Sequence, residues 1–135
     1  DSSTSRGLGD VYKRQVYANL TSLAQALETL LRNAIRHSPP QGRVRLNGVL
    51  EGDCWHLCLV DDGPGIEERY LETIFEPFAR LDSARPGDGG FGLGLSIARS
   101  AIALQDGRLW AQSPPGSGLQ MHLLLPAAEV QAQTV

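Results

Sequence analysis

Long apolar runs are missing from this sequence. No stretch of about 18 or more apolar residues occurs in it, the length that a membrane-spanning helix needs, although 41% of its 135 residues are hydrophobic. No positively charged and then apolar leader opens the chain either. We therefore expect no membrane-inserted segment within these residues.

Basic residues and cysteines are also few. The formal charge is −3, from 12 basic and 15 acidic side chains, whereas nucleic-acid-binding domains usually carry a basic patch. We expect no nucleic-acid partner, so any anionic ligand must be held locally. Cys54 and Cys58 lie too far apart along one predicted strand to form a disulfide, and no metal-ligand spacing includes them. Two reduced thiols fit a cytosolic setting.

The first 15 residues differ from the rest of the chain. They show no helical or strand period and contain the only lysine, Lys13. Residues 10–15 back-translate to GATGTGTATAAGAGACAG, which resembles the transposon end used in sequencing-library adaptors, and residues 5–9 resemble the adaptor bases just upstream. We expect residues 1–15 to be an adaptor artefact and the natural protein to be longer. A genuine flexible tail is the alternative.

The remaining length is enough for one domain. A chain of this size buries roughly two thirds of its unfolded surface, so we expect one core within residues 16–128 and a disordered tail over 129–135. Apolar residues recur at three- and four-residue steps over 21–37, where two prolines follow, and again over 93–107. Both segments are predicted to be helices.

Period-2 alternation predicts four strands, over residues 44–48, 55–60, 108–112 and 119–125. The first two are expected to pair antiparallel. A short helix is expected at residues 67–75 and a mobile loop at residues 76–90, which show no period. This order of elements is typical of an α+β, two-layer sandwich in which about three helices cover one face of a mixed sheet.

A carboxylate and two glycines follow the second predicted strand. Asp61 lies two residues after Leu59, so it is expected on the apolar face, where a buried polar group needs a partner. A carboxylate at this place can accept the amino protons of adenine, while Gly63 and Gly65 let a ligand approach the backbone. The alternative is an ordinary Asp-Gly turn in which Asp61 caps the next helix.

Glycines also run directly into the second long helix, at Gly90, Gly92 and Gly94. The free N–H groups of a helix N-terminus attract phosphate. A GxGxxG spacing begins at Gly87, but a polar loop rather than a strand precedes it, and no Walker-type GK[ST] is present. The alternative is that these glycines only hinge a loop.

The first helix carries polar residues beside its apolar stripe, namely Thr29, Asn33, Arg36 and His37. The Asn33 amide oxygen can ligate a hard cation such as Mg²⁺, which usually keeps water and substrate phosphates in its shell. Arg36 supplies a fixed cation for phosphate. The alternative is a solvated helix face.

Together these segments resemble, in the same order, four boxes of the ATP-binding catalytic domain of two-component sensor histidine kinases, within the superfamily that includes gyrase, Hsp90 and MutL. Residues 30–39 resemble the asparagine box, 61–66 the first glycine box, 74–80 the phenylalanine box and 90–95 the second glycine box. The likeness covers residues 20–126 and implies a Bergerat-type ATP-binding fold.

The resemblance also implies a role for each matching residue. Asn33 would ligate Mg²⁺, Arg36 would contact phosphate, and Asp61 would bind adenine. Phe75 and Phe78 would anchor the ATP lid. Other matching residues would make room for the nucleotide, steady the γ-phosphate, hinge the lid or cradle the phosphates: Gly63, Gly65, Arg80, Arg85, Gly90, Gly92, Leu93, Gly94 and Leu95.

The resemblance implies a histidine kinase that transfers the γ-phosphoryl of ATP to a histidine on a helical phosphoacceptor domain missing from this chain. The domain would be cytoplasmic. Its parent would be a bacterial, inner-membrane-associated homodimer with a cognate response regulator. Thr29 stands where gyrase-like and Hsp90-like members carry the glutamate that activates water, which disfavours hydrolysis.

None of the three histidines lies in a phosphoacceptor context. His37 falls inside the asparagine box, and His56 and His122 are predicted to face outward from strands. Two alternatives remain: a degenerate, non-enzymatic nucleotide-binding module, and a serine-directed anti-sigma kinase of the same superfamily.

Overall fold

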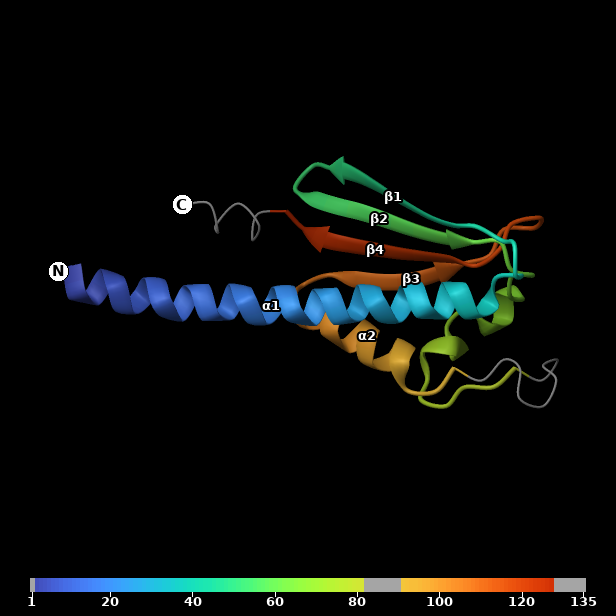
Figure 1. The fold of residues 1–135 in the computed structure, drawn as a ribbon, viewed down its shortest axis with the longest axis horizontal. Coiled ribbons are helices and arrows are strands. Elements are labelled where there is room, and N and C mark those ends of the chain that lie inside the picture. The colour runs from blue at the N-terminus through green and yellow to red at the C-terminus, as the bar shows by residue number, and fades with distance from the viewer. Residues whose placement is uncertain (1, 82–90, 128–135) are drawn as a thin grey trace.

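The computed structural model describes the backbone of residues 2–81 and 91–127 and the side chains of residues 20–81 and 91–127. Arg85, Gly90 and the tail predicted at 129–135 therefore lie outside the described residues. The described chain forms a sheet with helices on one face, which confirms the expected α+β fold (Figure 1). Its elements, in chain order, are α1 (Ser2–His37), β1 (Val44–Glu51), β2 (Cys54–Asp61), the 3-10 turns η1 (Glu68–Tyr70) and η2 (Thr73–Phe75), α2 (Gly94–Leu104), β3 (Arg108–Gln112) and β4 (Gln120–Pro126).

Helix α1 ends where the sequence predicts and begins earlier. It runs to His37, and the Ser38 N–H still donates to the Ala34 carbonyl at 3.0 Å, after which Pro39 has no N–H to continue the ladder. Residues 2–20 contain no proline, and a nucleated helix grows by one hydrogen bond per residue. The adaptor origin of residues 1–15 stays a prediction. Among the described residues, no helix is both long and apolar enough to cross a membrane.

The four described strands are all antiparallel, in the order β1-β2-β4-β3, rather than mixed as expected. The β1–β2 hairpin is confirmed: it pairs Val44 with Asp61 and Glu51 with Cys54, and its turn contains Gly52 at φ +61°. A short connection can join antiparallel strands, whereas a parallel pair needs a crossover. The second pair, β3 and β4, is also joined by a short connection, and β4 aligns antiparallel to β2.

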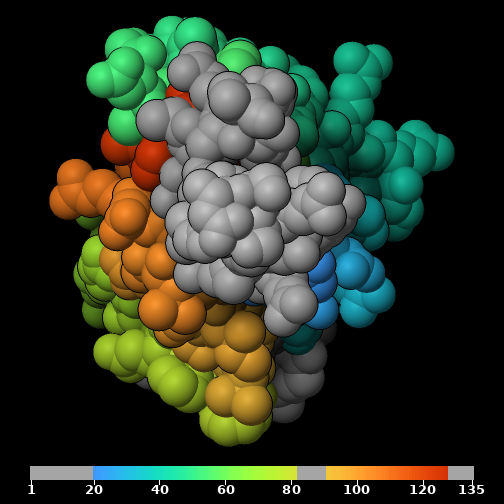
Figure 2. Space-filling view, turned by 90° about the vertical axis from the view of Figure 1, so that its left-hand side faces the viewer, coloured from blue at the N-terminus to red at the C-terminus, as the bar shows by residue number. Residues whose placement is uncertain are grey.

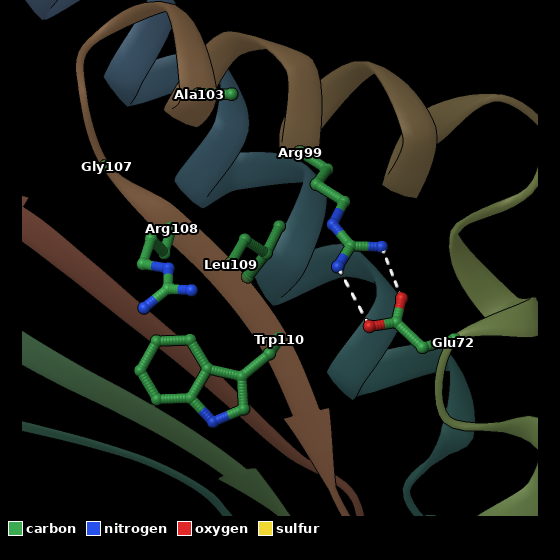
Figure 3. A pocket seen from close by; sticks show the side chains of 7 residues that line it. All are labelled: Glu72, Arg99, Ala103, Gly107, Arg108, Leu109 and Trp110. Atoms are coloured by element: carbon green, nitrogen blue, oxygen red, sulfur yellow. Dashed lines mark hydrogen bonds and ion pairs between the residues drawn. The ribbon is translucent and has the colours of Figure 1, made fainter.

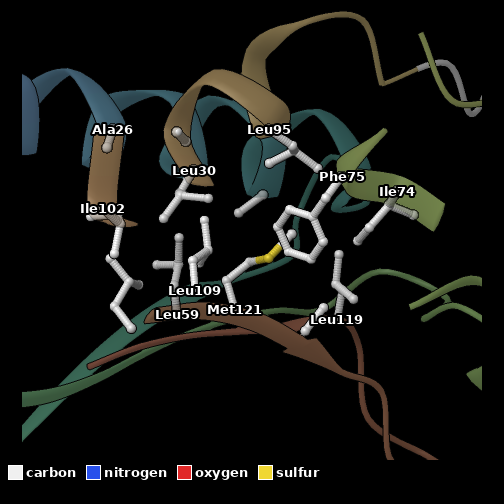
Figure 4. Close-up of a cluster of buried hydrophobic side chains, with 14 of the residues drawn as sticks. Ala26, Leu30, Leu59, Ile74, Phe75, Leu95, Ile102, Leu109, Leu119 and Met121 are labelled. Atoms are coloured by element: carbon white, nitrogen blue, oxygen red, sulfur yellow. The ribbon is translucent and has the colours of Figure 1, made fainter. Parts of the chain in front are cut away.

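The core lies between the sheet and its helices. On the sheet, the inward residues include Leu59, Met121 and Leu123, all at most 3% exposed. On α1, Leu30 is fully buried, and Ala26 and Ala34 flank it with small side chains that let the helix approach the strands. The other labelled members of this cluster in Figure 4 are Ile74, Phe75, Leu95, Ile102, Leu109 and Leu119.

Residues 67–75 form η1 and η2 instead of one short helix. A short segment gains too few i→i−4 hydrogen bonds to offset helix nucleation, and 3-10 turns are common as connectors. The two turns place Tyr70, Ile74 and Phe75 in the interior. The third helix expected on this face is therefore a pair of short turns.

The uncovered face of the sheet carries an imidazole pair. His56 Nε2 and His122 Nδ1 are 3.0 Å apart, and the Trp110 ring stacks on His122 with centroids 5.3 Å apart. His122 Nε2 lies 3.8 Å from the Cys58 thiol, which is free, as is that of Cys54. Both histidines face outward as predicted, and they contact each other across β2 and β4.

The two ends of the molecule differ. The β1–β2 turn and the α2–β3 connection lie at one end, which faces the viewer in Figure 2. The end of α1, the end of β2, the start of α2 and the β3–β4 connection lie at the other end (Figure 1). The described residues of the predicted site gather at this second end.

Truncation of a buried isoleucine tests the core. Ile102 is fully buried on α2, and Ile97 on the same helix is 61% exposed. We expect Ile102→Ala to lower the free energy of unfolding by about 2–5 kcal/mol, because the lost packing leaves a cavity. Ile97→Ala, the matched control, should change it by less than about 0.5 kcal/mol. Urea unfolding measures both, and equal losses would contradict the assignment of the core.

Stability should fall between pH 7.5 and pH 5.5. Burial, followed by the charge of His56, lowers the pKa of His122 below the ordinary imidazole value of 6.5. As the pH falls through about 6.5, the unfolded chain gains a proton that the folded chain resists, so stability present above that pH is lost below it. His37 contributes in the same direction. Urea midpoints at the two pH values should differ less in His122→Gln than in the unchanged protein; an equal difference would refute the role of His122.

Candidate functional site

Asp61 is a buried carboxylate at the end of β2. It is 3% exposed, and its Oδ1 accepts hydrogen bonds from the Gly63 N–H at 2.8 Å and the Leu119 N–H at 3.2 Å. Its own N–H donates to the Leu119 carbonyl at 3.1 Å. Buried polar groups are stable when they are hydrogen-bonded in this way. Within the described part of the chain no hydrogen bond reaches Oδ2, so that oxygen is left for another donor.

The alternative role of Asp61 as a helix cap is wrong. The first turn after it, η1, has Glu67 at its cap position, with no side-chain cap hydrogen bond. Asp61 instead closes a local turn through the Gly63 N–H and joins that turn to β4 through Leu119. The burial expected from the spacing of Asp61 and Leu59 is confirmed.

The first glycine segment packs closely against the neighbouring chain. A Cβ at Gly63 would lie 2.5 Å from the His37 carbonyl oxygen, so this turn touches the end of α1. Gly65 has φ +78°, and a Cβ there would lie 2.5 Å from Ser113 Oγ and 3.0 Å from the Ser117 carbonyl oxygen. The sequence predicts that these glycines let a ligand approach the backbone. The described structure shows that other segments of the chain also approach both glycines closely, at His37 and at Ser113.

One face of α1 spans the distance between the first glycine segment, residues 61–66, and the described part of the second, residues 91–95. Thr29 lies beside the second segment, since its methyl group would be 3.0 Å from a Cβ at Gly94. His37 lies beside the first, through its carbonyl at Gly63. Asn33 is one helical turn from each of them on the same face. Asn33 is half-buried, and the side chain of Arg36 is exposed.

His37 links this face to the residues on both sides. Its ring stacks on Phe91, with centroids 5.2 Å apart. Burial, followed by the charge of Arg36, lowers the pKa of His37, and the carboxylate of Asp61 acts in the opposite direction. Its Nε2 is buried and has no hydrogen-bond partner among the described residues. The sequence analysis assigned His37 no role in the site, although its position four residues after Asn33 places both residues on the same face of α1.

The two phenylalanines expected at the lid have different surroundings. Phe75 is 5% exposed, and the Arg99 guanidinium lies 4.4 Å above its ring. Phe78 is 67% exposed and has φ +57°, an unusual conformation for a bulky residue. Two backbone hydrogen bonds join this segment to the start of α2: Phe78 N–H to the Gly92 carbonyl at 2.7 Å, and Phe91 N–H to the Ala79 carbonyl at 3.1 Å.

The second glycine segment leads into α2. Gly92 has φ +55° and open space where a Cβ would point, whereas Gly94 begins the helix. The first N–H groups of a helix have no partner within it, so the start of α2 offers donors at the same end of the molecule as Asp61 (Figure 1). Leu93 is 45% exposed and Leu95 is 2% exposed, within the core. Arg80 is exposed.

A cavity of about 580 Å³ adjoins Asp61. Asp61 and Gly63 are therefore brought together in this cavity, whereas Asn33 and Arg36 do not line it. The residues that line it come from β1, the first glycine segment and the β3–β4 connection: Arg45, Asp61, Asp62, Gly63, Pro64, Gly116, Ser117 and Gly118.

Two other cavities, of about 420 and 550 Å³, flank an ion pair between Glu72 and Arg99 (Figure 3). Arg99 donates to both Glu72 oxygens, at 2.6 and 3.1 Å, and these hydrogen bonds lower the pKa of Glu72. Because Glu72 is 75% exposed, the pair adds little stability. Of the predicted site residues that the structure describes, Phe75 alone lines one of these two cavities.

A pair of glycine substitutions tests the packing of the first glycine segment. Gly65 and Gly116 have nearly the same φ, +78° and +79°, but a Cβ at Gly116 meets nothing within 4 Å. Alanine at either position should cost roughly 1–2 kcal/mol for the left-handed backbone. Gly65→Ala should cost clearly more, because its Cβ also overlaps Ser113 and Ser117. Urea unfolding measures the difference, and equal losses would contradict the close packing.

Comparison with known proteins agrees with this geometry. Residues 18–129 match the family described as histidine kinase-, DNA gyrase B- and HSP90-like ATPases. The sensor protein PfeS of Pseudomonas aeruginosa is 60% identical over 114 residues, which cover 84% of this chain and 25% of PfeS. The chain therefore spans about a quarter of the length of this relative.

Solved structures show the same fold. The mycobacterial sensor histidine kinase MprB has a TM-score of 0.69 and 34% identity, over 78% of this chain and 72% of that one. The catalytic domain of histidine kinase ThkA, in a nucleotide-free form, has a TM-score of 0.66 and 27% identity, over 79% of this chain and 68% of that one. The chain thus belongs to the histidine kinase-, DNA gyrase B- and HSP90-like ATPases, as an ATP-binding domain of the kind found in sensor histidine kinases.

Proposed function

We propose that this domain binds Mg-ATP and donates its γ-phosphoryl to a histidine on a helical phosphoacceptor domain elsewhere in the parent protein. The main support is the face of α1 that carries Asn33. It runs from the first glycine segment, at Gly63, to the start of α2, at Gly94. A nucleotide held at both segments extends along this face, with its base near Asp61 and its phosphates near α2.

Asp61 binds the adenine in this proposal. Its Oδ1 is occupied by two backbone N–H groups, which fix the orientation of the carboxylate. Its Oδ2 then accepts from the exocyclic amino group of the base, a hydrogen bond to a charged group worth about 1.5–3 kcal/mol. Gly63 and Gly65 hold the turn in the shape that keeps Asp61 in place.

The phosphates lie at the N-terminus of α2, where helix N–H groups and the helix dipole favour negative charge. Arg36 and Arg80, both exposed, supply mobile positive charge for the phosphate oxygens. Gly92 and Gly94 let the chain approach the phosphates closely, and Leu93 lies between them. The predicted contacts of Arg85 and Gly90 belong to this proposal as well.

Asn33 would hold Mg²⁺ through its amide oxygen. The described part of the chain has no group of three or more His, Cys, Asp or Glu side chains that could hold a metal ion. Mg²⁺ does not need such a group, because it takes few protein ligands and keeps water and phosphate oxygens in its shell. When bound, Mg²⁺ neutralises charge that develops on the phosphates. The protein's own part is to orient the nucleotide so that the bond between the β–γ bridging oxygen and Pγ breaks as an imidazole nitrogen bonds to Pγ, with ADP leaving.

Thr29 favours transfer over hydrolysis. Its methyl group lies against Gly94, and a hydroxyl is too weak a base to activate water at neutral pH. We propose that the parent protein is a bacterial, inner-membrane-associated homodimer that passes the phosphoryl group to a cognate response regulator. The names of the relatives, which are sensor proteins and histidine kinases, support this reading.

Asn33→Ala and Asp61→Asn test the proposal by different routes. Calorimetric titration should show Mg-ATP binding to the unchanged chain and at least a tenfold weaker affinity for Asp61→Asn, because a charged hydrogen bond to adenine is lost. Asn33→Ala should abolish phosphorylation of a phosphoacceptor domain supplied in trans from a sensor-kinase relative. The exposed residues Asn47 and Asp53 provide the controls Asn47→Ala and Asp53→Asn.

Three results would count against the proposal. An unchanged chain that binds no Mg-ATP would refute it. If binding occurs and Asn33→Ala leaves phosphorylation intact, the metal role is wrong. If binding occurs without any transfer, the chain is a non-enzymatic nucleotide module. Acid treatment of the product separates the remaining alternative, since phosphohistidine is acid-labile and phosphoserine is not.

A further inference from the structure

Ser113 lies directly after β3 and contacts the first glycine segment at Gly65 and Ile66. Its Oγ accepts a hydrogen bond from the Ile66 N–H at 2.9 Å. The same Oγ would lie 2.5 Å from a Cβ at Gly65, so the hydroxyl fills the space that a side chain there would need. The turn over residues 61–66 is therefore held at its far end, Ile66, by a hydrogen bond to a side chain.

The near end of this turn, at Asp61, contacts the β3–β4 connection, which also contains Ser113. Leu119, which precedes β4, donates its N–H to Asp61 Oδ1 at 3.2 Å and accepts from the Asp61 N–H at 3.1 Å. A Cβ at Gly118 would overlap the Asp61 carbonyl oxygen. The β3–β4 connection thus holds the turn at both ends: through Leu119 at Asp61 and through Ser113 at Ile66.

These two fastenings have different chemistry. On the Leu119 side, both contacts use the backbone N–H and C=O, which most substitutions at that position preserve. Ser113 acts through its side chain, so its contact depends on residue type. If the Ile66 hydrogen bond is lost, the turn is still held at Asp61 and at Asp62, whose carboxylate accepts from the Arg43 N–H at 2.8 Å. The far half of the turn can then shift, and with it Gly63, whose N–H orients the Asp61 carboxylate.

We infer that Ser113 is a positioning residue of the nucleotide site, whose hydroxyl holds the turn of residues 61–66 so that Asp61 meets the amino group of adenine. This inference rests on the proposed function. Ser113 does not touch the nucleotide; it acts through Ile66 and Gly65 on Asp61. It therefore affects the selection of the base more than the binding of the phosphates.

The test compares ATP with ITP, which carries an oxygen in place of the adenine amino group. Calorimetric titrations of the 135-residue chain with each nucleotide and Mg²⁺ give an ATP/ITP affinity ratio. Ser113→Ala should weaken ATP binding about threefold to tenfold, the effect of one hydrogen bond, and should leave ITP binding nearly unchanged. Partial unfolding would lower the affinities for ATP and ITP by the same factor, so the affinity ratio distinguishes a positioning role from a loss of stability.

Two further variants complete the test. Ser100→Ala is the matched control, because Ser100 is exposed on α2 and does not line the cavity beside Asp61; its ratio should equal that of the unchanged chain. Ser113→Thr keeps a hydroxyl and should restore most of the ratio. If the unchanged chain binds ATP with a high ratio and Ser113→Ala keeps that ratio, the inference is wrong while the proposed function stands. If the unchanged chain binds neither nucleotide, both are wrong.

Discussion

Burial of the Asp61 carboxylate is the constraint on which the site depends. A charged group at 3% exposure is costly unless hydrogen bonds replace its water, and the donors available to Asp61 are backbone N–H groups of Gly63 and Leu119. Those donors belong to two separate segments. Satisfying one carboxylate therefore brings the turn after β2 and the connection before β4 into contact and fixes the end of the sheet.

Helix α1 connects this end of the sheet to the second glycine segment. The inward stripe around Leu30 packs it against the strands, and this packing sets the rotation of the helix about its axis. The polar face with Thr29, Asn33 and His37 must then lie beside Gly94 and Gly63. Core packing and site geometry are thus two consequences of one helix orientation, since residues one turn apart share a face.

Local patterns in the sequence predicted most of the fold. The C-terminal end of α1, the start of α2, the four strands and the burial of Asp61 follow from periods of two or 3.6 residues and from the prolines after His37. The start of α1 and the end of α2 do not, since α1 begins earlier and α2 ends at Leu104. The pairing of β2 with β4 does not, because it joins segments far apart in the chain, and the sheet was expected to be mixed. The contacts of Asp61 with Leu119 and of Ile66 with Ser113 were missed for the same reason.

Phe78 shows a different limit of sequence reasoning. Phe75 and Phe78 belong to one motif, yet one is buried and the other is 67% exposed. The chain reverses after η2, and Phe78 takes φ +57° as its N–H reaches the Gly92 carbonyl. Such a backbone angle depends on a tertiary hydrogen bond. The motif identifies the residue type and not its surroundings.

The paired hydrogen bonds between Phe78 and Gly92 and between Ala79 and Phe91 have an evolutionary consequence. They clamp the two ends of the intervening segment together independently of what lies between them. For a flexible segment closed between two such points, the entropic cost of closure grows only with the logarithm of its length, about 0.6 kcal/mol for each doubling. Insertions and deletions between the clamped residues are therefore cheap, and descendants of this domain can diversify that stretch while the sheet and helices stay unchanged.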